Sequence, residues 1–184
     1  SHNVLAYGSN ISPNNFIGFH LFYLDSGPME VTTEQFPDGT GEDFSVMGLA
    51  LRGTYARVMT DRLKIGVSIK YVREQIHTTR MQTFALDVGS NFDTGIYGFH
   101  LGMSVSNFGP EVQFTGEGLE VTVGDEESPD STLAKVTKQF SLPLMFRLGV
   151  KNDIIGKTSV FVPNTEHRLT VAIDGINPID YTTY

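Results

Sequence analysis

Four charged or titratable side chains could meet on one face of a sheet: Arg52, Lys70, Asp87 and His100. Each lies in a stretch of alternating residues, and folding neighbouring stretches symmetrically about their connections places Arg52 near Lys70 and Lys70 opposite Asp87. The same procedure places His100 near Asp87. A carboxylate flanked by cations in a polar lumen stays ionised and paired, which holds the wall in shape. The row therefore predicts a lumenal ion pair with a structural role, and the alternative is a proton or substrate relay.

Other groups of residues that could carry chemistry give weaker signals. Residues 124–130, GDEESPD, offer oxygen ligands for calcium but lack the spacing of a known calcium loop, which favours a solvated acidic loop. Residues 38–43, DGTGED, contain Gly-x-Gly, but no helical pattern follows that could present its N-terminus to a phosphate. The five histidines show no close metal-ligand spacing, and no Gly-x-Ser-x-Gly elbow occurs. We therefore predict a protein that is not an enzyme and has no metal site and no cofactor.

The composition narrows the classes of partner. The 184 residues suffice for one domain or for part of a larger one, and the formal net charge is -8 at pH 7. No basic patch emerges to neutralise phosphates, which argues against a nucleic-acid partner. Cysteine is absent, so there is no disulfide framework and no thiolate chemistry. No apolar run approaches the ~18 residues of a spanning helix, although barrel strands escape that test because only every second residue must be apolar.

The elements that must position the charged residues are long alternating stretches. Residues 47–56 and 63–72 form two arms around the polar centre MTDR, and apolar side chains occupy one parity of each arm. Alternation over such lengths predicts β-strands. The same pattern recurs at residues 17–23, 84–89, 97–106, 142–151 and 168–174. We expect about eight antiparallel strands and little helix.

The predicted connections alternate in length. Short turns near residues 10–15, 60–62 and 93–95 fall at one end of the sheet, and the long stretches 25–43 and 107–139 fall at the other, together with the short segment 76–81. Outer-membrane barrels have this asymmetry of short periplasmic turns and long outer loops. Only the connection 152–166 breaks the pattern, because it is long at the short-turn end.

Three further features favour a membrane barrel over a soluble β-sandwich. Residues 63–71 would span roughly 20 Å at a ~45° tilt, close to the ~25 Å apolar band of a barrel. Tyr55 and Tyr97 lie on the apolar parity near the short turns and Tyr71 lies toward the loops, where aromatic girdles meet the membrane interfaces. The alternative for these aromatic residues is that they fill a core. The opposite parity is rich in Gly, Ala and Ser, which predicts a narrow or plugged lumen.

Successive motifs of the chain resemble those of the PorV/PorQ family of outer-membrane proteins. In order, they are MEVTTEQFPDGTGEDF, YARVMTDRLKIGVSIKYVRE, FALDVGSNFDTG, GFHLGMSVSNFGPEVQFTG, LPLMFRLGV and HRLTVAIDGINP. The resemblance covers most of the chain and implies a relative of the FadL-type barrels, with ~14 antiparallel strands in the outer membrane of a Gram-negative bacterium. It also implies that residues 1–184 are part of a single larger up-and-down β-barrel domain, and a complete eight-stranded barrel is the alternative.

The resemblance implies one of two functions. PorV-like members of the type IX secretion system receive cargo proteins at the translocon and pass them to the surface-attachment machinery, whereas FadL-like relatives admit hydrophobic small molecules. The inward residues assigned above are small or charged, which favours binding and makes the outer loops 25–43 and 107–139 the expected protein-binding surface. The expected partners are outer-membrane lipid, secreted cargo proteins and secretion-system components. A soluble extracellular β-sandwich with a structural role is a further alternative.

Overall fold

The computed structural model describes residues 1–116, 119–122, 132–134 and 137–179, and β-structure dominates them. Eight long strands form one sheet: β1 (His2–Ser12), β2 (Asn15–Asp25), β5 (Val46–Val58), β6 (Leu63–Ile76), β7 (Thr79–Asp93), β8 (Phe99–Phe108), β12 (Leu144–Gly156) and β14 (Leu169–Ile179). Each long strand pairs antiparallel with the next along the chain. The predicted all-β antiparallel fold is therefore confirmed.

Alternation along each strand sorts the residues onto two faces. One row across five strands joins Tyr55, Val67, Val88, Val105 and Phe146, which lie directly opposite one another in turn. Because side chains along a strand point alternately to the two faces, this row and its neighbours form an apolar face. Most of its side chains are exposed to solvent in the isolated chain.

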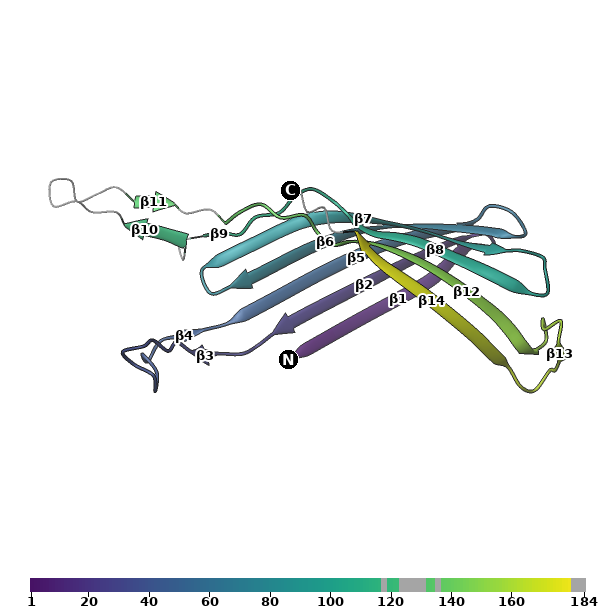
Figure 1. The fold of residues 1–184 in the computed structure, drawn as a ribbon, viewed down its shortest axis with the longest axis horizontal. Helices are drawn as coiled ribbons and strands as arrows, with labels where there is room; N and C mark the ends of the chain where they lie inside the picture. Colours follow the sequence, from purple (N-terminus) through teal and green to yellow (C-terminus); the bar gives the residue numbers. More distant parts are fainter. Residues whose placement is uncertain (117–118, 123–131, 135–136, 180–184) are drawn as a thin grey trace.

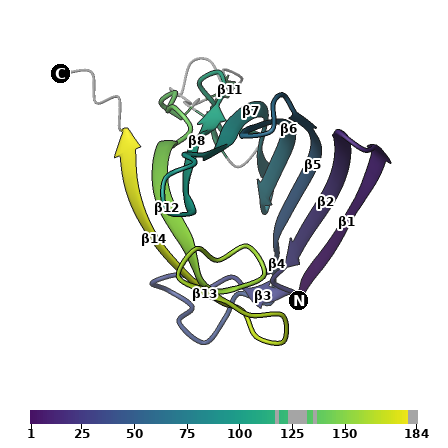
Figure 2. The ribbon, with the colours of Figure 1, turned by 90° about the vertical axis from the view of Figure 1, so that its right-hand side faces the viewer.

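The other face carries small and charged side chains. The adjacent row joins Ala56, Gly66, Gly89, Ser104 and Arg147 across the same five strands. Figure 2 shows that the sheet curves into a trough, with β1 at one edge and β14 at the other. Among the described strands, β1 pairs only with β2 and β14 pairs only with β12. The described sheet is open, so its closure into a barrel stays a prediction.

The two ends of the sheet differ in their connections (Figure 1). Tight turns at residues 13–14, 59–62 and 94–98 join strands at one end. The connection from β2 to β5 at the other end carries β3 (Met29–Glu30) and β4 (Asp43–Phe44). The connection from β8 to β12 carries β9 (Thr115–Gly116), β10 (Glu120–Thr122) and β11 (Thr132–Ala134). The connection from β12 to β14 carries β13 (Val162–Pro163) at the tight-turn end.

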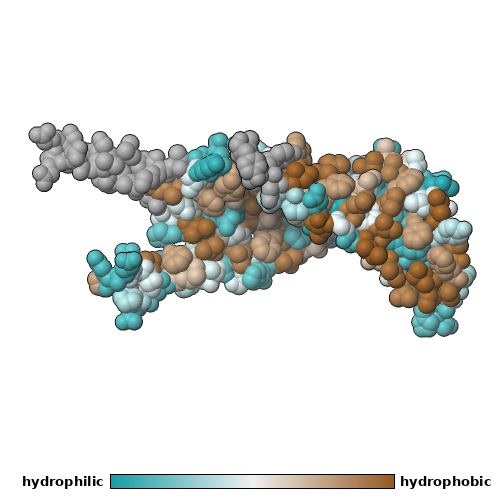
Figure 3. Space-filling view, in the orientation of Figure 1, coloured by the Kyte–Doolittle hydropathy of each residue, from teal (hydrophilic) through white to brown (hydrophobic). Residues whose placement is uncertain are grey.

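Few large apolar side chains are buried. Met81, Ala85, Val112 and Leu144 are the buried apolar residues in the described part of the chain, and all four lie toward the end with the long connections. The long strands instead expose their apolar residues, and Figure 3 shows these residues gathered over the strands, with hydrophilic residues at the tips of the loops. A globular domain normally covers such a face with a second layer. Among the described residues, no helix has the length and apolar character required to cross a membrane.

Candidate functional site on the concave face

Asp87 lies at the centre of a charged cluster on the concave face. Lys70 Nζ lies 2.7 Å from Asp87 Oδ1, and Arg52 Nη2 lies 3.3 Å from Asp87 Oδ2. The side chains of Lys70 and Asp87 are only 10% and 14% exposed, whereas that of Arg52 is 44% exposed. Lys70 and Asp87 therefore form a largely buried ion pair, and Arg52 extends from it toward solvent.

The structure brings three of the four predicted charged residues together, by a register that differs from the predicted one. Arg52 was predicted to lie near Lys70, and it lies directly opposite this residue. Lys70 lies opposite Ala85, and Asp87 lies opposite Ser68, because the hairpin of β6 and β7 turns at residues 77–78. The ion pair forms because a long lysine side chain can reach a diagonal neighbour two residues along the next strand.

His100 does not join the cluster, so its predicted position near Asp87 is wrong. It lies opposite Asp93 on β7 and Lys151 on β12. Asp93 lies six positions further along β7 than Asp87, which is about 20 Å along the strand. The error arises because the pairing of β7 with β8 is centred in the turn at residues 94–98 and not in the FDTG motif. His100 Nδ1 is buried and has no hydrogen-bond partner in the described part of the chain.

Asn107 is the residue of the cluster that sequence reasoning missed. Its backbone N–H donates a hydrogen bond of 2.8 Å to Asp87 Oδ1, and Lys70 Nζ donates to Asn107 Oδ1. Asn107 adopts a φ of 67°, in the left-handed region that asparagine tolerates better than most residues. The sequence signal was the motif Asn-Phe-Gly-Pro, which indicates the end of a strand but not the contact.

A groove of about 660 Å³ runs along the concave face beside this cluster. Arg52, Lys64 and Arg147 supply its positive charges, and Asp87 and Asp174 supply its negative charges. Its floor is made of glycine, alanine and serine residues, which leaves room above the backbone. The groove therefore combines a few charged side chains with a lining that is otherwise small or apolar. Lys70 and Asn107 already occupy the oxygen of Asp87 that lies nearest to them. The narrow or plugged lumen predicted from the small residues of this face stays a prediction.

The described residues offer little for metal or phosphate chemistry. Within them, no group of three or more His, Asp or Glu side chains is arranged to hold a metal ion. The acidic stretch 124–130 lies outside the described residues. Residues 38–42 lie in the connection between β3 and β4, where Gly39 and Gly41 adopt positive φ angles, and Asp43 begins β4. The chemistry that this site supports is ion pairing and hydrogen bonding.

The three tyrosines predicted at the membrane interfaces lie at different places in the fold. Tyr55 on β5 donates a hydrogen bond of 2.6 Å from its hydroxyl to Asn15 Oδ1, near the tight-turn end. Tyr71 on β6 lies further toward the long connections, and its ring centroid is 5.2 Å from that of Phe84. Tyr97 lies in the turn at residues 94–98 with a φ of 47°, and β8 begins only at Phe99. The prediction that Tyr97 lies on a strand is therefore wrong.

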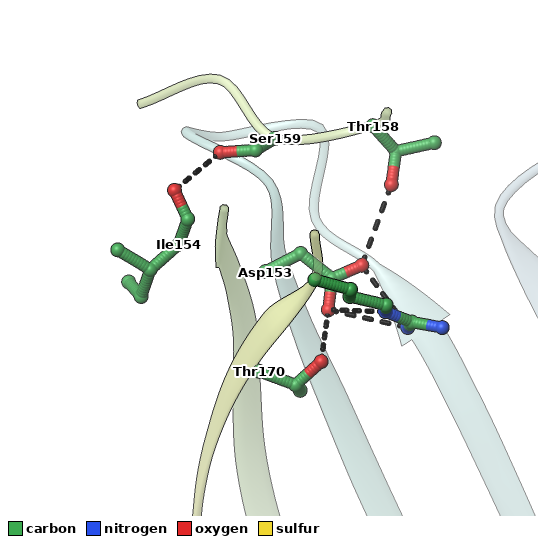
Figure 4. A network of polar contacts seen from close by, with 6 residues as sticks. Asp153, Ile154, Thr158, Ser159 and Thr170 are labelled. Atoms are coloured by element: carbon green, nitrogen blue, oxygen red, sulfur yellow. Dashed lines mark hydrogen bonds and ion pairs between the residues drawn. The ribbon is translucent and has the colours of Figure 1, made fainter. Parts of the chain in front are cut away.

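A second polar network holds the connection between β12 and β14 (Figure 4). Asp153 accepts hydrogen bonds from Thr170 Oγ1 at 2.6 Å and from Arg168 Nη2 at 3.1 Å. The Ser159 hydroxyl donates to the backbone oxygen of Ile154 at 2.7 Å. The same hydroxyl accepts from the backbone N–H groups of Phe161 and Val162 at 3.1 and 3.0 Å. This network fixes the one long connection at the tight-turn end.

Replacing Ser159 with alanine is expected to loosen this connection. Ser159 is 7% exposed, and the variant removes the acceptor of the Phe161 and Val162 N–H groups, at a cost of about 1 kcal/mol. Amide hydrogen exchange should accelerate at Phe161 and Val162 and stay unchanged in β5 and β6. The matched control is Thr158→Ala, which removes one 3.3 Å bond from an exposed side chain. Equal exchange in the two variants would contradict this prediction.

These observations define a class of protein: a large curved antiparallel sheet with an apolar convex face and, among the described residues of its concave face, a charged cluster around Asp87. No family model matches the chain, and a search of curated proteins finds no significant match.

Proposed function

We propose that the chain is a section of an outer-membrane β-barrel of the PorV/PorQ type, in a Gram-negative bacterium. In this proposal it is not an enzyme and serves as a binding or shuttle component of type IX protein secretion. The observation that carries the proposal is the apolar face, which extends over all eight long strands and is largely exposed. A lipid bilayer would cover this face without a second protein layer.

The dimensions of the strands support a membrane location. β6 and β7 contain 14 and 15 residues. At a rise of about 3.3 Å and a tilt of about 45°, such strands span roughly 33 Å, which exceeds the ~25 Å apolar band of a membrane barrel. In the alternative, a soluble β-sandwich, a second sheet would pack against the apolar face. The described residues form one large sheet and two short two-stranded sheets in its long connections, and these offer no such layer.

The open edges support a barrel larger than these eight strands. Nearly every residue of β1 and every residue of β14 is exposed. In a membrane, an unpaired edge would leave backbone N–H and C=O groups without partners, and each such group costs several kcal/mol. Closure therefore requires either a direct pairing of β1 with β14, which the described sheet does not contain, or further strands between them, and our proposal takes the second course.

The concave face favours binding over transport of hydrophobic solutes. Its groove contains Arg52, Asp87 and Arg147, and a hydrophobic solute would gain little from contact with these charged side chains. The alternative, a FadL-like transporter, is favoured by one observation. An apolar recess of about 390 Å³ lies beside Phe84, Leu86 and Phe108, where β8 ends. Purified protein that retains lipid or fatty acid in this recess would support the alternative.

The experiment that tests the proposal is a pull-down of the intact native protein in mild detergent, with mass spectrometry of bound proteins and bound lipids. We expect secreted proteins with a C-terminal sorting domain among the partners. They should be lost when residues 117–136 are replaced by a short Gly-Ser linker, which keeps both described ends of that connection. Replacing residues 32–41 tests the other long connection separately, and Thr158→Ala at the tight-turn end is the control. Fatty acid without protein partners would favour the transporter, and a monodisperse protein without detergent would contradict both functions.

A further inference from the structure

Asn107 connects the concave ion pair to both ends of the long connection between β8 and β12. Its backbone N–H donates to Asp87, and its side-chain oxygen accepts from Lys70. Its side-chain Nδ2 donates a hydrogen bond of 2.9 Å to the backbone oxygen of Pro143. Because Asn107 is the second-last residue of β8 and Pro143 directly precedes β12, one side chain holds both ends of the connection at the wall. We name Lys70, Asp87 and Asn107 the Asn107 cluster.

The backbone beside the Asn107 cluster leaves the sheet in a defined direction. The register of β7 against β8 shifts between Leu86 and Val88, and Asn107 has a left-handed φ of 67°. Gly109 then passes close to β7, since a Cβ at this position would lie 2.5 Å from the backbone oxygen of Phe84. A side chain at Gly109 would push the chain away from β7. The exit of the connection is therefore determined by contacts with the wall.

The two ends continue side by side beyond the Asn107 cluster. Val112 and Phe140 form an antiparallel bridge through two backbone hydrogen bonds, with N-to-O distances of 2.8 and 2.9 Å. Gln113 Nε2 donates to the Thr137 backbone oxygen at 2.7 Å, and the rings of Phe114 and Phe140 stack at 6.0 Å. Val112 is buried. A change in the position of Asn107 is thus passed to residues 110–116 and 137–143.

We propose that the Asn107 cluster positions the base of this connection, so that the concave ion pair controls how the connection is presented to a protein partner. The inference rests on the proposed function in one respect, that this connection carries the binding surface. Asp87 accepts a hydrogen bond from the Asn107 backbone, and Lys70 donates one to the Asn107 side-chain oxygen. The side-chain NH₂ group of Asn107 is then free to bind the backbone oxygen of Pro143. Loss of either charge releases the two ends.

The test uses amide hydrogen exchange of the intact protein in detergent, with three variants. Asn107→Gly removes the side chain but keeps a residue that tolerates the left-handed backbone, and Asp87→Asn removes the charge. Asp153→Asn, which weakens the other well-formed ion pair at the tight-turn end, is the matched control. We expect exchange at residues 107–112 to be about tenfold faster in the first two variants, because a hydrogen bond to a charged group has been lost or weakened. The control should leave these residues unchanged.

A second readout exploits the absence of cysteine in the chain. A spin label on Glu111→Cys, at an exposed position in the connection, should become more mobile with Asn107→Gly and not with Asp153→Asn. Unchanged exchange and unchanged label mobility in Asn107→Gly would overturn the inference. So would a looser connection that still captures its protein partner with undiminished yield. Absence of any captured partner in the wild type contradicts the proposed function instead, and the exchange result then still decides whether the Asn107 cluster positions the connection.

Discussion

Replacing Asp87 with alanine is expected to lower the free energy of unfolding by about 3–5 kcal/mol, because Lys70 would keep its charge in a largely buried position without a counterion. The side chain of Lys70 is 10% exposed, and its Nζ lies 2.7 Å from Asp87. The variant also removes the acceptor of the Asn107 N–H group. Urea unfolding in detergent micelles, followed by far-ultraviolet circular dichroism, measures the change.

Two further variants separate the contribution of the buried pair from that of the neighbouring cation. Arg52→Ala should cost less than about 1 kcal/mol, because its guanidinium is 44% exposed and its contribution is screened by solvent. Asp87→Ala combined with Lys70→Met should recover part of the lost stability, since no unpaired charge remains. If Asp87→Ala and Arg52→Ala cost the same, then Lys70 is hydrated in the folded protein and the pair does not hold the wall.

Replacing Ile69 with lysine is expected to destabilise the folded protein by about 2–4 kcal/mol in a bilayer or micelle, the cost of a lysine at the midplane of a barrel wall. Ile69 lies at the middle of β6 on the apolar face and is 58% exposed. On a sheet that faced water, the same exposed position would accept lysine with little change in stability. The sign and size of the effect therefore distinguish a membrane-facing surface from a water-facing one. Unfolding in micelles and in detergent-free buffer provides the comparison.

A matched pair of positions on β1 tests whether the effect belongs to the apolar face. Val4 and Leu5 are adjacent and are 62% and 60% exposed. Leu5 lies opposite Leu21 on the apolar face, and Val4 lies opposite Phe22 on the concave face. Leu5→Lys should be much more costly than Val4→Lys. Equal costs at the two positions, together with a neutral Ile69→Lys, would favour the soluble sheet.

The strands could be predicted from the sequence because their alternation is long and regular. The apolar parity of residues 63–72 became the exposed face of β6, and the hairpin of β5 and β6 brings Arg52 and Lys70 together as predicted, directly opposite each other. This register could be predicted because the MTDR centre is short and the arms on either side contain no bulge. The alternation of the arms and the short polar turn specify the same hairpin.

The register of β7 against β8 could not be predicted in this way. Tyr97 adopts a positive φ between two glycines that do the same, Gly95 and Gly98, so the turn is centred later than the sequence suggested. The register then shifts again between Leu86 and Val88. Folding a hairpin symmetrically cannot detect such shifts, because they depend on backbone conformations that alternation does not encode. His100 was misplaced for this reason, and the contact of Asn107 with Asp87 was missed.

The open edges of the sheet also constrain what can complete it. Eight strands that alternate in direction leave β1 and β14 running opposite ways. A closed sheet in which every neighbouring pair is antiparallel needs an even total, so any strands that fill the gap must come in pairs. His2 on β1 and Ile179 on β14 both lie at the end with the long connections, because they pair with Leu24 and Leu144. Added hairpins would therefore have to meet this chain on that side of the wall.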